Sequence, residues 1–139
     1  MNVLVFAFHS GSVDHDRYHS WLQTTCVEDE PIGLSEMALS AFIRIATHPR
    51  IYTRPAAMTD ALEFASMLRN LQNSVIVAPG NRHWEIFERL CLDAGARGNL
   101  VTDAYFAALA IESGCEWITT DRDFSRFPGL RWRHPLVAR

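Results

Sequence analysis

The sequence predicts an α/β fold in which a short parallel sheet is covered by helices on both faces. Short apolar stretches with the length of strands alternate along the chain with longer stretches whose apolar residues recur at helical spacing. Parallel strands need crossover connections, and helices usually provide them. With 139 residues, the chain is expected to form one domain, residues 1–139, large enough to bury a core without disulfides or a structural metal.

The first element is ambiguous by its pattern. The run NVLVFAF, residues 2–8, has the length of a buried strand, but a buried helix is equally allowed for such a run. It is too short to span a bilayer, and no Lys or Arg precedes it as a secretory signal would require. We therefore expect no membrane segment and a cytoplasmic location.

Two amphipathic helices are predicted next. Apolar residues recur at helical spacing in residues 14–26 and 35–47, and the second helix should be capped by Ser35 and end before Pro49. Between these helices PIGLS, residues 31–35, is short, apolar and opened by Pro. This stretch predicts a brief strand.

A third helix is expected to begin at a cap formed by Thr59 or Asp60, with Glu63 placed for a capping box with Asp60. The following SVIVAP stretch predicts a strand. A fourth helix has its apolar stripe from Trp84 onward and should stop near Gly95, a typical C-terminal glycine.

A fifth, Ala-rich helix should run from a Thr102 cap to Gly114. The apolar run that follows predicts a strand that leads into Asp121, and LRWRHPL, residues 130–136, predicts a last strand. Helices and short strands thus alternate to the end of the chain.

Carboxylates stand at the ends of three predicted elements. Glu36 follows the Ser35 cap, Asp103 follows the Thr102 cap, and Asp121 ends a strand. Taken singly, an acid in a first helical turn is explained by the helix dipole, and an Asp by a turn. In a doubly wound sheet, however, the carboxyl ends of the strands and the following helix N-termini share one rim.

Carboxylates that converge on such a rim repel one another unless a hard cation neutralises them, and Mg²⁺ favours sparse carboxylate sites that retain water. The sequence therefore predicts a Mg²⁺ site formed by Glu36, Asp103 and Asp121. Asp123 is either a further ligand or the cap of the following turn FSRF, and the cap is favoured.

Basic residues are concentrated near the C-terminus. The net charge of −3 argues against a general electrostatic nucleic-acid binder. Every basic residue other than His is Arg, which fits either codon bias in a GC-rich genome or phosphate recognition by guanidinium groups. Five of these arginines follow Asp121: Arg122, Arg126, Arg131, Arg133 and Arg139.

Zinc chemistry is the rival interpretation. His15 and His19 share one helix face, but the zinc motif needs a Glu beside the first His and a third ligand, and Asp16 stands there instead. Surface histidines are therefore favoured. The cysteines form no CxxC pair, so we expect buried, small apolar residues and neither disulfides nor a zinc site. They are Cys26, Cys91 and Cys115.

Four stretches together resemble the PIN-domain ribonucleases, in particular the VapC-type toxins of mycobacterial toxin–antitoxin modules. They are NVLVFA, SEMALSAFIRIATHPRIY, GNLVTDAYFAALAIESG and WITTDRDFSRFPGLRWRHPL. The resemblance covers essentially the whole chain. It implies a three-layer α/β/α sandwich in which residues 2–8 start the first helix, Mg²⁺- or Mn²⁺-dependent cleavage of RNA, a homodimer, and an antitoxin partner laid over the active site.

The resemblance also assigns roles to acidic residues. Glu36, Asp103 and Asp121 resemble the second, third and fourth acids of the family's catalytic, metal-binding site. Asp123 matches an additional acid that is common in the family.

Other roles follow in the same way. Thr119 or Thr120 resembles the hydroxyl residue that hydrogen-bonds near the metal, and Asn2 matches the Asn of the family's opening pattern. Apart from the resemblance, the cluster of arginines near the C-terminus predicts that Arg122, Arg131 and Arg133 grip the RNA backbone.

One family feature is absent. The first acid should stand two residues before Asn2, which is one position ahead of Met1, the first residue of this chain. A GTG codon is read as Val within a gene but as Met at a start, so we hypothesise that translation begins upstream and adds a short strand ending in Asp.

The leading interpretation is a toxin endoribonuclease of a type II module. The alternative is an impaired PIN-like module that binds antitoxin or RNA without cutting, and a receiver domain is disfavoured because the chain has no Lys.

Overall fold

The computed structural model describes residues 2–137 and divides them into two compact units, residues 2–76 and 77–137. Each unit combines helices with a pair of short parallel strands. This composition confirms the α/β class. No helix in the described part of the chain is both long and apolar enough to cross a membrane.

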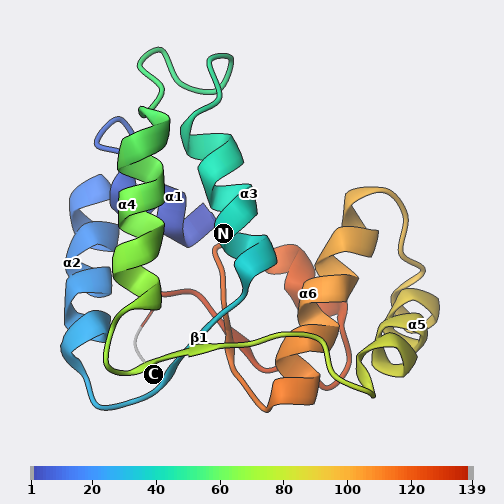
Figure 1. The fold of residues 1–139 in the computed structure, drawn as a ribbon. Helices are drawn as coiled ribbons and strands as arrows, with labels where there is room; N and C mark the ends of the chain where they lie inside the picture. The colour runs from blue at the N-terminus through green and yellow to red at the C-terminus, as the bar shows by residue number, and fades with distance from the viewer. Residues whose placement is uncertain (1, 138–139) are drawn as a thin grey trace. The chain divides into compact units, whose positions relative to one another are not determined.

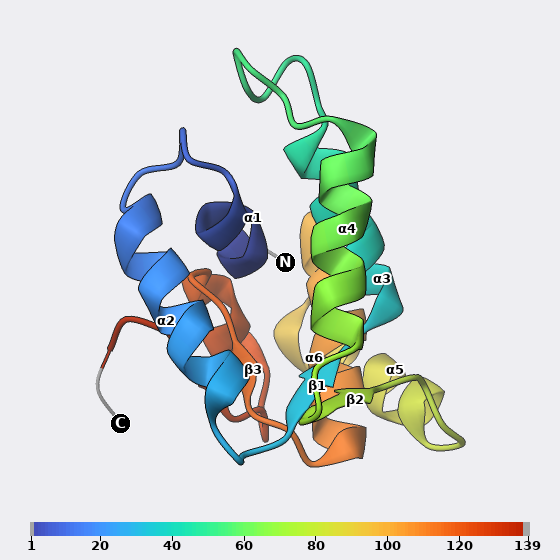
Figure 2. The same cartoon turned by 60° about the vertical axis from the view of Figure 1, so that its left-hand side comes forward.

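The first unit packs helices around a central one. Its elements are α1 (Asn2–Phe8), α2 (His15–Val27), β1 (Ile32–Leu34), α3 (Glu36–Ala46), α4 (Met58–Arg69) and β2 (Ser74–Ile76). Helix α1 lies between α2 and the α3–α4 pair (Figure 1 and Figure 2). Strands β1 and β2 pair in parallel, with Ile32 opposite Ser74 and Leu34 opposite Ile76, which confirms both predicted strands.

The ambiguous run at residues 2–8 is the helix α1. Its Val5 belongs to a buried cluster with Phe42 of α3 and Ala61 of α4, and Phe8 packs against this cluster. The ring of Phe8 meets that of Phe42 edge-on, with centroids 5.3 Å apart. Because α1 has helices on two sides, apolar residues are needed all around it, and the helical period cannot be read from its sequence.

The predicted cap of α3 is confirmed, whereas that of α4 is wrong. The hydroxyl of Ser35 accepts a hydrogen bond from the Ala38 N–H, and α3 ends at Ala46, ahead of Pro49. Helix α4 begins at Met58 after an N-cap residue whose side chain makes no capping bond. Asp60 therefore lies inside the first turn, where the helix dipole stabilises its charge without a capping box.

The second unit contains α5 (His83–Ala94), α6 (Asn99–Ser113), β3 (Trp117–Ile118), the 3₁₀ helix η1 (Arg122–Arg126) and β4 (Trp132–Arg133). Helix α5 packs beside α6 (Figure 1). Strands β3 and β4 pair in parallel, with Trp117 opposite Trp132. Both strands were predicted, and Gly95 and Gly114 end their helices in the left-handed conformation, as expected.

Helix α6 begins earlier than predicted. It starts at Asn99 after Gly98, which has φ of 55°, a conformation that glycine adopts at little cost. Thr102 therefore lies within the helix and is not its cap. Asp103 is the fifth helical residue and not a first-turn acid, so the helix dipole does not explain its position.

The α5–α6 pair is held by polar contacts as well as apolar ones. The Glu112 carboxylate of α6 accepts hydrogen bonds from the N–H groups of Gly80 (2.7 Å) and Arg82 (2.9 Å). The buried His83 donates from Nε2 to the carbonyl of Tyr105 (2.9 Å). These bonds fix the start of α5 against α6, and with it the helix that carries Asp103.

Candidate carboxylate site

Asp121 is positioned by a chain of local hydrogen bonds after β3. The buried Thr119 hydroxyl accepts from the Asp121 N–H (3.1 Å), and the Asp121 carboxylate accepts from the Asp123 N–H (2.8 Å). Asp121 is thus the N-cap of η1. The prediction that Asp123 is the cap is wrong, because the side chain two residues earlier satisfies the first free N–H of this turn.

Asp123 stands in the first turn of η1. Its carboxylate forms an ion pair with Arg126 at 3.9 Å, and its side chain is 59% exposed. An exposed pair at this separation contributes little to stability. The Asp123 carboxylate therefore remains accessible while it adds negative charge beside Asp121.

Asp103 shares this electrostatic environment. Burial on α6, together with the neighbouring charges of Asp121 and Asp123, raises the pKa of Asp103 from an ordinary value of 3.8 to about 6. Both causes disfavour the ionised form. The second unit thus places the Asp103 carboxylate within the electrostatic influence of two other predicted acids, which is the condition under which a cation is attracted.

Glu36 occupies a different environment in the first unit. It is the first residue of α3, and its Oε2 lies 3.2 Å from Nη2 of Arg69 at the end of α4. Both side chains are largely exposed. The charge of Glu36 is therefore already balanced by a guanidinium group. Its convergence with the aspartates of the second unit stays a prediction.

Among the remaining predicted residues, Thr119 and Arg131 form hydrogen bonds within the second unit. Asn2 begins α1 and is exposed, and Thr120 is half-buried beside the anchored Thr119. Arg131 donates from Nη2 to the Gly114 carbonyl (3.0 Å). These contacts give Thr119 and Arg131 structural roles within the second unit.

Arg133 has a contact of the same kind. It donates from Nε to the Glu116 carboxylate (3.2 Å), and its side chain is only 17% exposed, against 35% for Glu116. Arg122 is exposed and makes no hydrogen bond or ion pair with residues 2–137. Of the three arginines assigned to RNA, Arg122 is the one that the described fold leaves without a structural partner.

A preformed metal cluster is not seen. Among residues 2–137, no group of three or more His, Cys, Asp or Glu side chains is arranged to hold a metal ion. Mg²⁺ needs only one or two protein carboxylates, because it keeps several waters. The donor type and the crowding around Asp103 therefore fit a sparse Mg²⁺ or Mn²⁺ site.

The rival histidines have a structural role. His15 and His19 donate from Nδ1 to the Phe6 and Ala7 carbonyls (2.9 and 3.2 Å), which lie in the last turn of α1. They thereby satisfy carbonyls that a helix C-terminus leaves free. The cysteines are half-buried and unbonded to one another, a milder burial than predicted.

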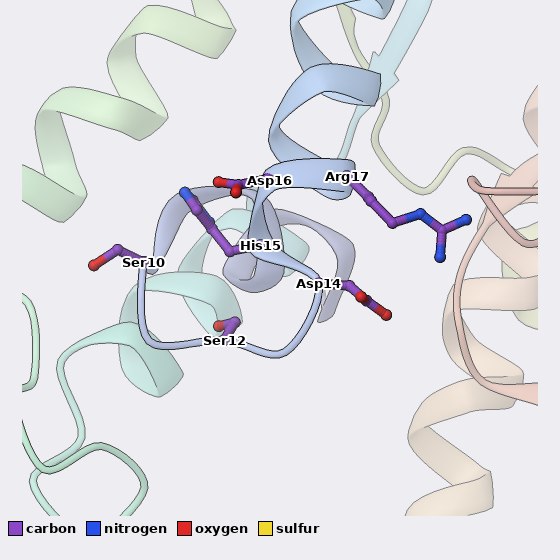
Figure 3. Close-up of a pocket in the computed structure, with 6 residues that line it drawn as sticks. All are labelled: Ser10, Ser12, Asp14, His15, Asp16 and Arg17. Carbon is purple, nitrogen blue, oxygen red and sulfur yellow. The ribbon is translucent and has the colours of Figure 1, made fainter.

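A shallow hollow of about 400 Å³ adjoins His15. Its lining residues are Ser10, Ser12, Asp14, His15, Asp16 and Arg17 (Figure 3). Asp14 and Arg17 point away from Ser10 and His15. This divergence offers no common point at which a ligand could be held by several of these side chains.

Two features of the site were not predicted. Arg69 lies far from Glu36 in the chain, so no local pattern reveals their pairing. The capping role of Asp121 had a local signal, since an Asp two residues before an N–H commonly forms such a turn. Applied to this stretch, the same spacing rule predicts Asp121, and not Asp123, as the cap of η1.

Comparison with known proteins gives concordant matches. The family model for the PIN domain matches residues 2–130. Ribonuclease VapC43 of Mycobacterium tuberculosis is 40% identical over 136 residues, covering 98% of this chain and 92% of that protein. Ribonuclease VapC25 of the same species is 30% identical over 137 residues, covering 99% and 96%.

A solved structure shows the same fold. The crystal structure of VapBC2 from Rickettsia felis, bound to a DNA fragment from its promoter, contains a chain that aligns with a TM-score of 0.67. The alignment covers 96% of this chain and 93% of that chain at 16% identity. At this identity the likeness is one of fold, and it supports the α/β architecture over nearly the full length.

Proposed function

Because the chain belongs to the PIN-domain family, with VapC ribonucleases as relatives, we propose that it is a toxin endoribonuclease of a type II toxin–antitoxin module. It hydrolyses RNA phosphodiester bonds with the help of Mg²⁺ or Mn²⁺. The observation that carries this proposal within the molecule is the raised pKa of Asp103 beside Asp121 and Asp123. Crowded carboxylates of this kind are typical of a cation-dependent site.

The aspartates have distinct parts in this proposal. Asp103 and Asp121 would hold the cation, and Glu36 would join them as the third catalytic acid. Bound there, Mg²⁺ would neutralise charge on the phosphodiester and promote ionisation of the attacking water. Thr119 keeps the Asp121 backbone in place through its hydroxyl. Asp123 supplies additional negative charge, with Arg126 as its counter-ion.

The partners are proposed on the same basis. VapBC2, named for a toxin–antitoxin pair, is the structural neighbour, and we expect this chain likewise to bind a cognate antitoxin, to form a homodimer and to act in the cytoplasm. Arg122, Arg131 and Arg133 would contact the RNA backbone. Arg122 is the strongest of these candidates, because the other two already hold Gly114 and Glu116.

RNA cleavage by the purified chain tests the proposal. An RNA with single-stranded loops is incubated with the wild-type protein in Mg²⁺, in Mn²⁺ or in EDTA, alongside the Asp103→Asn and Asp93→Asn variants. Asp93 is an exposed Asp on α5 of the same unit and serves as the matched control. We expect fragments only with a metal ion, from the wild type and Asp93→Asn but not from Asp103→Asn.

Two outcomes would contradict the proposal. Fragments that persist in EDTA or in Asp103→Asn would show cleavage independent of this site. An intact RNA under every condition, together with binding of the antitoxin, would favour the module that binds without cutting.

A further inference from the structure

A second hollow, of about 540 Å³, lies in the second unit beside η1 and β4. Helix η1 contributes Arg122 and Ser125, and β4 contributes Trp132 and Arg133. Its lining is completed by His134 and Val137. Hollows of this size hold small ligands or single units of a polymer.

Three polar or aromatic side chains of this hollow are not engaged by the described part of the chain. Within residues 2–137, the side chains of Arg122, Ser125 and Trp132 make no hydrogen bond, ion pair or ring contact. Arg133 uses only Nε, toward Glu116. The hollow therefore presents an indole ring, a hydroxyl and guanidinium nitrogens that can bind something outside the described chain.

The two tryptophans that stand opposite each other on β3 and β4 differ in their aromatic contacts. Trp117 of β3 stacks on Phe106 with centroids 5.3 Å apart and contacts Phe124 at 5.4 Å. Its partner in the strand register, Trp132, has no aromatic neighbour in residues 2–137 and lines the hollow. Trp117 thus has aromatic partners within the second unit, whereas Trp132 lines the hollow.

Charge around the hollow favours an anion. On a chain with a net charge of −3, residues 122–137 contain four arginines and one acid, Asp123. The Asp123 charge is shared with Arg126 and the Glu116 charge with Arg133, so Arg122 is the arginine at the rim that forms no ion pair with residues 2–137. Guanidinium groups with an unpaired aromatic ring are the combination that single-stranded nucleic acid binds, through its phosphates and bases.

We propose that this hollow binds one nucleotide of single-stranded RNA, with its base stacked on Trp132 and its phosphate contacted by Arg122 and Arg133. The inference rests on the proposed function, since it names where the RNA would lie. It adds a base-stacking residue, Trp132, to the arginines already considered. Ser125 is placed to donate a hydrogen bond to the base or sugar. Because η1 starts at the Asp121 cap, the nucleotide would contact the short helix whose N-cap is one of the proposed catalytic carboxylates.

Binding of a fluorescein-labelled single-stranded RNA decamer, measured by anisotropy in EDTA, separates this site from cleavage. The variants are Trp132→Ala, Trp132→Phe and Arg122→Gln in the full chain. Matched controls are Trp84→Ala, which removes an indole that is 61% exposed on α5, and Arg89→Gln, which removes an exposed charge from the same helix. Circular dichroism and thermal melting establish that each variant is folded.

We expect Trp132→Ala to weaken binding about tenfold and Trp132→Phe to retain most of it, because a base stacks on either ring. Arg122→Gln should weaken binding and make the slope of log affinity against log salt shallower by about 0.7. The two controls should bind as the wild type does. Equal affinities for Trp132→Ala and Trp84→Ala in folded proteins would overturn the proposal.

Two further outcomes separate this inference from the proposed function. If the wild type cleaves RNA with Mg²⁺ but Trp132→Ala binds RNA normally, the nucleotide site is wrong and the ribonuclease stands. If Trp132→Ala loses affinity for the antitoxin and not for RNA, the hollow is a protein-binding site and the inference is overturned. If the wild type never cuts RNA but Trp132→Ala binds RNA more weakly than the wild type, the hollow is supported and the ribonuclease is contradicted.

Discussion

Glu36 and Asp103 are both acids on helices, but their charges lie in opposite electrostatic environments. Glu36 is exposed and paired with Arg69 at 3.2 Å. Asp103 is half-buried, and burial with the nearby charges of Asp121 and Asp123 raises its pKa to about 6. A balanced charge stabilises the metal-free protein or leaves it unchanged, whereas an unbalanced one opposes folding until a cation or a proton arrives. The unbalanced charge that a cation would neutralise therefore lies in the second unit.

The largest expected effect is the loss of cleavage in Asp103→Asn. The amide keeps the shape of the side chain but removes the charge that holds the cation, so RNA cleavage should fall by about a hundredfold or more. The thermal midpoint at pH 7.5 without metal should not fall, because a repelled charge is removed. Gel analysis of RNA fragments and a melting curve check both parts. A variant that cuts normally would remove Asp103 from the site and end the contrast with Glu36.

The Asp121 side chain supplies both a negative charge and the N-cap of η1. Two substitutions separate the effects of these two roles. Asp121→Asn retains an oxygen that can accept from the Asp123 N–H, so it should lose most cleavage yet melt like the wild type. Asp121→Ala should in addition lose about 1 kcal/mol of stability with the cap. Cleavage assays and urea denaturation provide the comparison.

Asp123→Asn should reduce cleavage less, because its carboxylate is exposed and shared with Arg126. Equal losses of cleavage in the variants at positions 121 and 123 would contradict this ranking.

The pKa of Asp103 gives a pH dependence with a definite sign. Between about pH 4, near the pKa of an Asp in an unfolded chain, and pH 6, the folded state binds more protons at this residue than the unfolded state does. Its contribution to the free energy of unfolding therefore falls as the pH rises through this window. Asp103→Asn lacks this dependence. The difference in thermal midpoint, Asp103→Asn minus wild type, should therefore increase from pH 4 to pH 6.

Melting curves in EDTA across this range measure the effect, with Asp93→Asn as the variant that should follow the wild type. A constant difference between Asp103→Asn and the wild type would show that the carboxyl group of Asp103 titrates normally.

The smallest effect should come from removing the ion-pair partner of Glu36, the acid whose charge is balanced. Arg69→Gln removes the partner of Glu36, but exposed ion pairs of this kind contribute no more than about 1 kcal/mol. We expect a decrease in stability within that limit, and a smaller one at high salt because salt screens the pair in the wild type. A loss of several kcal/mol in urea denaturation would contradict the interpretation of Glu36–Arg69 as an ordinary exposed ion pair.

Local patterns predicted much of the fold. The Ser35 cap, the strands at residues 32–34 and 74–76, and the glycines that end α5 and α6 depend on contacts within a few residues. Such contacts are visible in a sequence because the partner stands nearby.

Other features depended on choices that the pattern leaves open. Thr102 offers a cap for α6, but Gly98 adopts a positive φ and the helix starts there, which moves Asp103 out of the first turn. Asp121 and Asp123 both offer caps for η1, and hydrogen-bond geometry selects the earlier one.

Long-range features could not be predicted. The Glu36–Arg69 pair joins the ends of two helices, and the aromatic contacts of Trp117 are with Phe106 of α6 and Phe124 of η1. The acids themselves were identified by residue type, and their grouping in the second unit emerges only from the electrostatics of Asp103.

Binding of Mn²⁺ to the RNA-free protein, measured by electron paramagnetic resonance, tests the central claim most directly. The claim is that the crowded aspartates of the second unit attract a divalent cation. At pH 7.5 the wild type should bind Mn²⁺, Asp103→Asn should bind it at least about tenfold more weakly, and Asp93→Asn should match the wild type. At pH 5, below the pKa of Asp103, protons compete with the cation and the affinity of the wild type should fall toward that of Asp103→Asn. Equal Mn²⁺ affinity of the wild type and Asp103→Asn at pH 7.5 would contradict the claim.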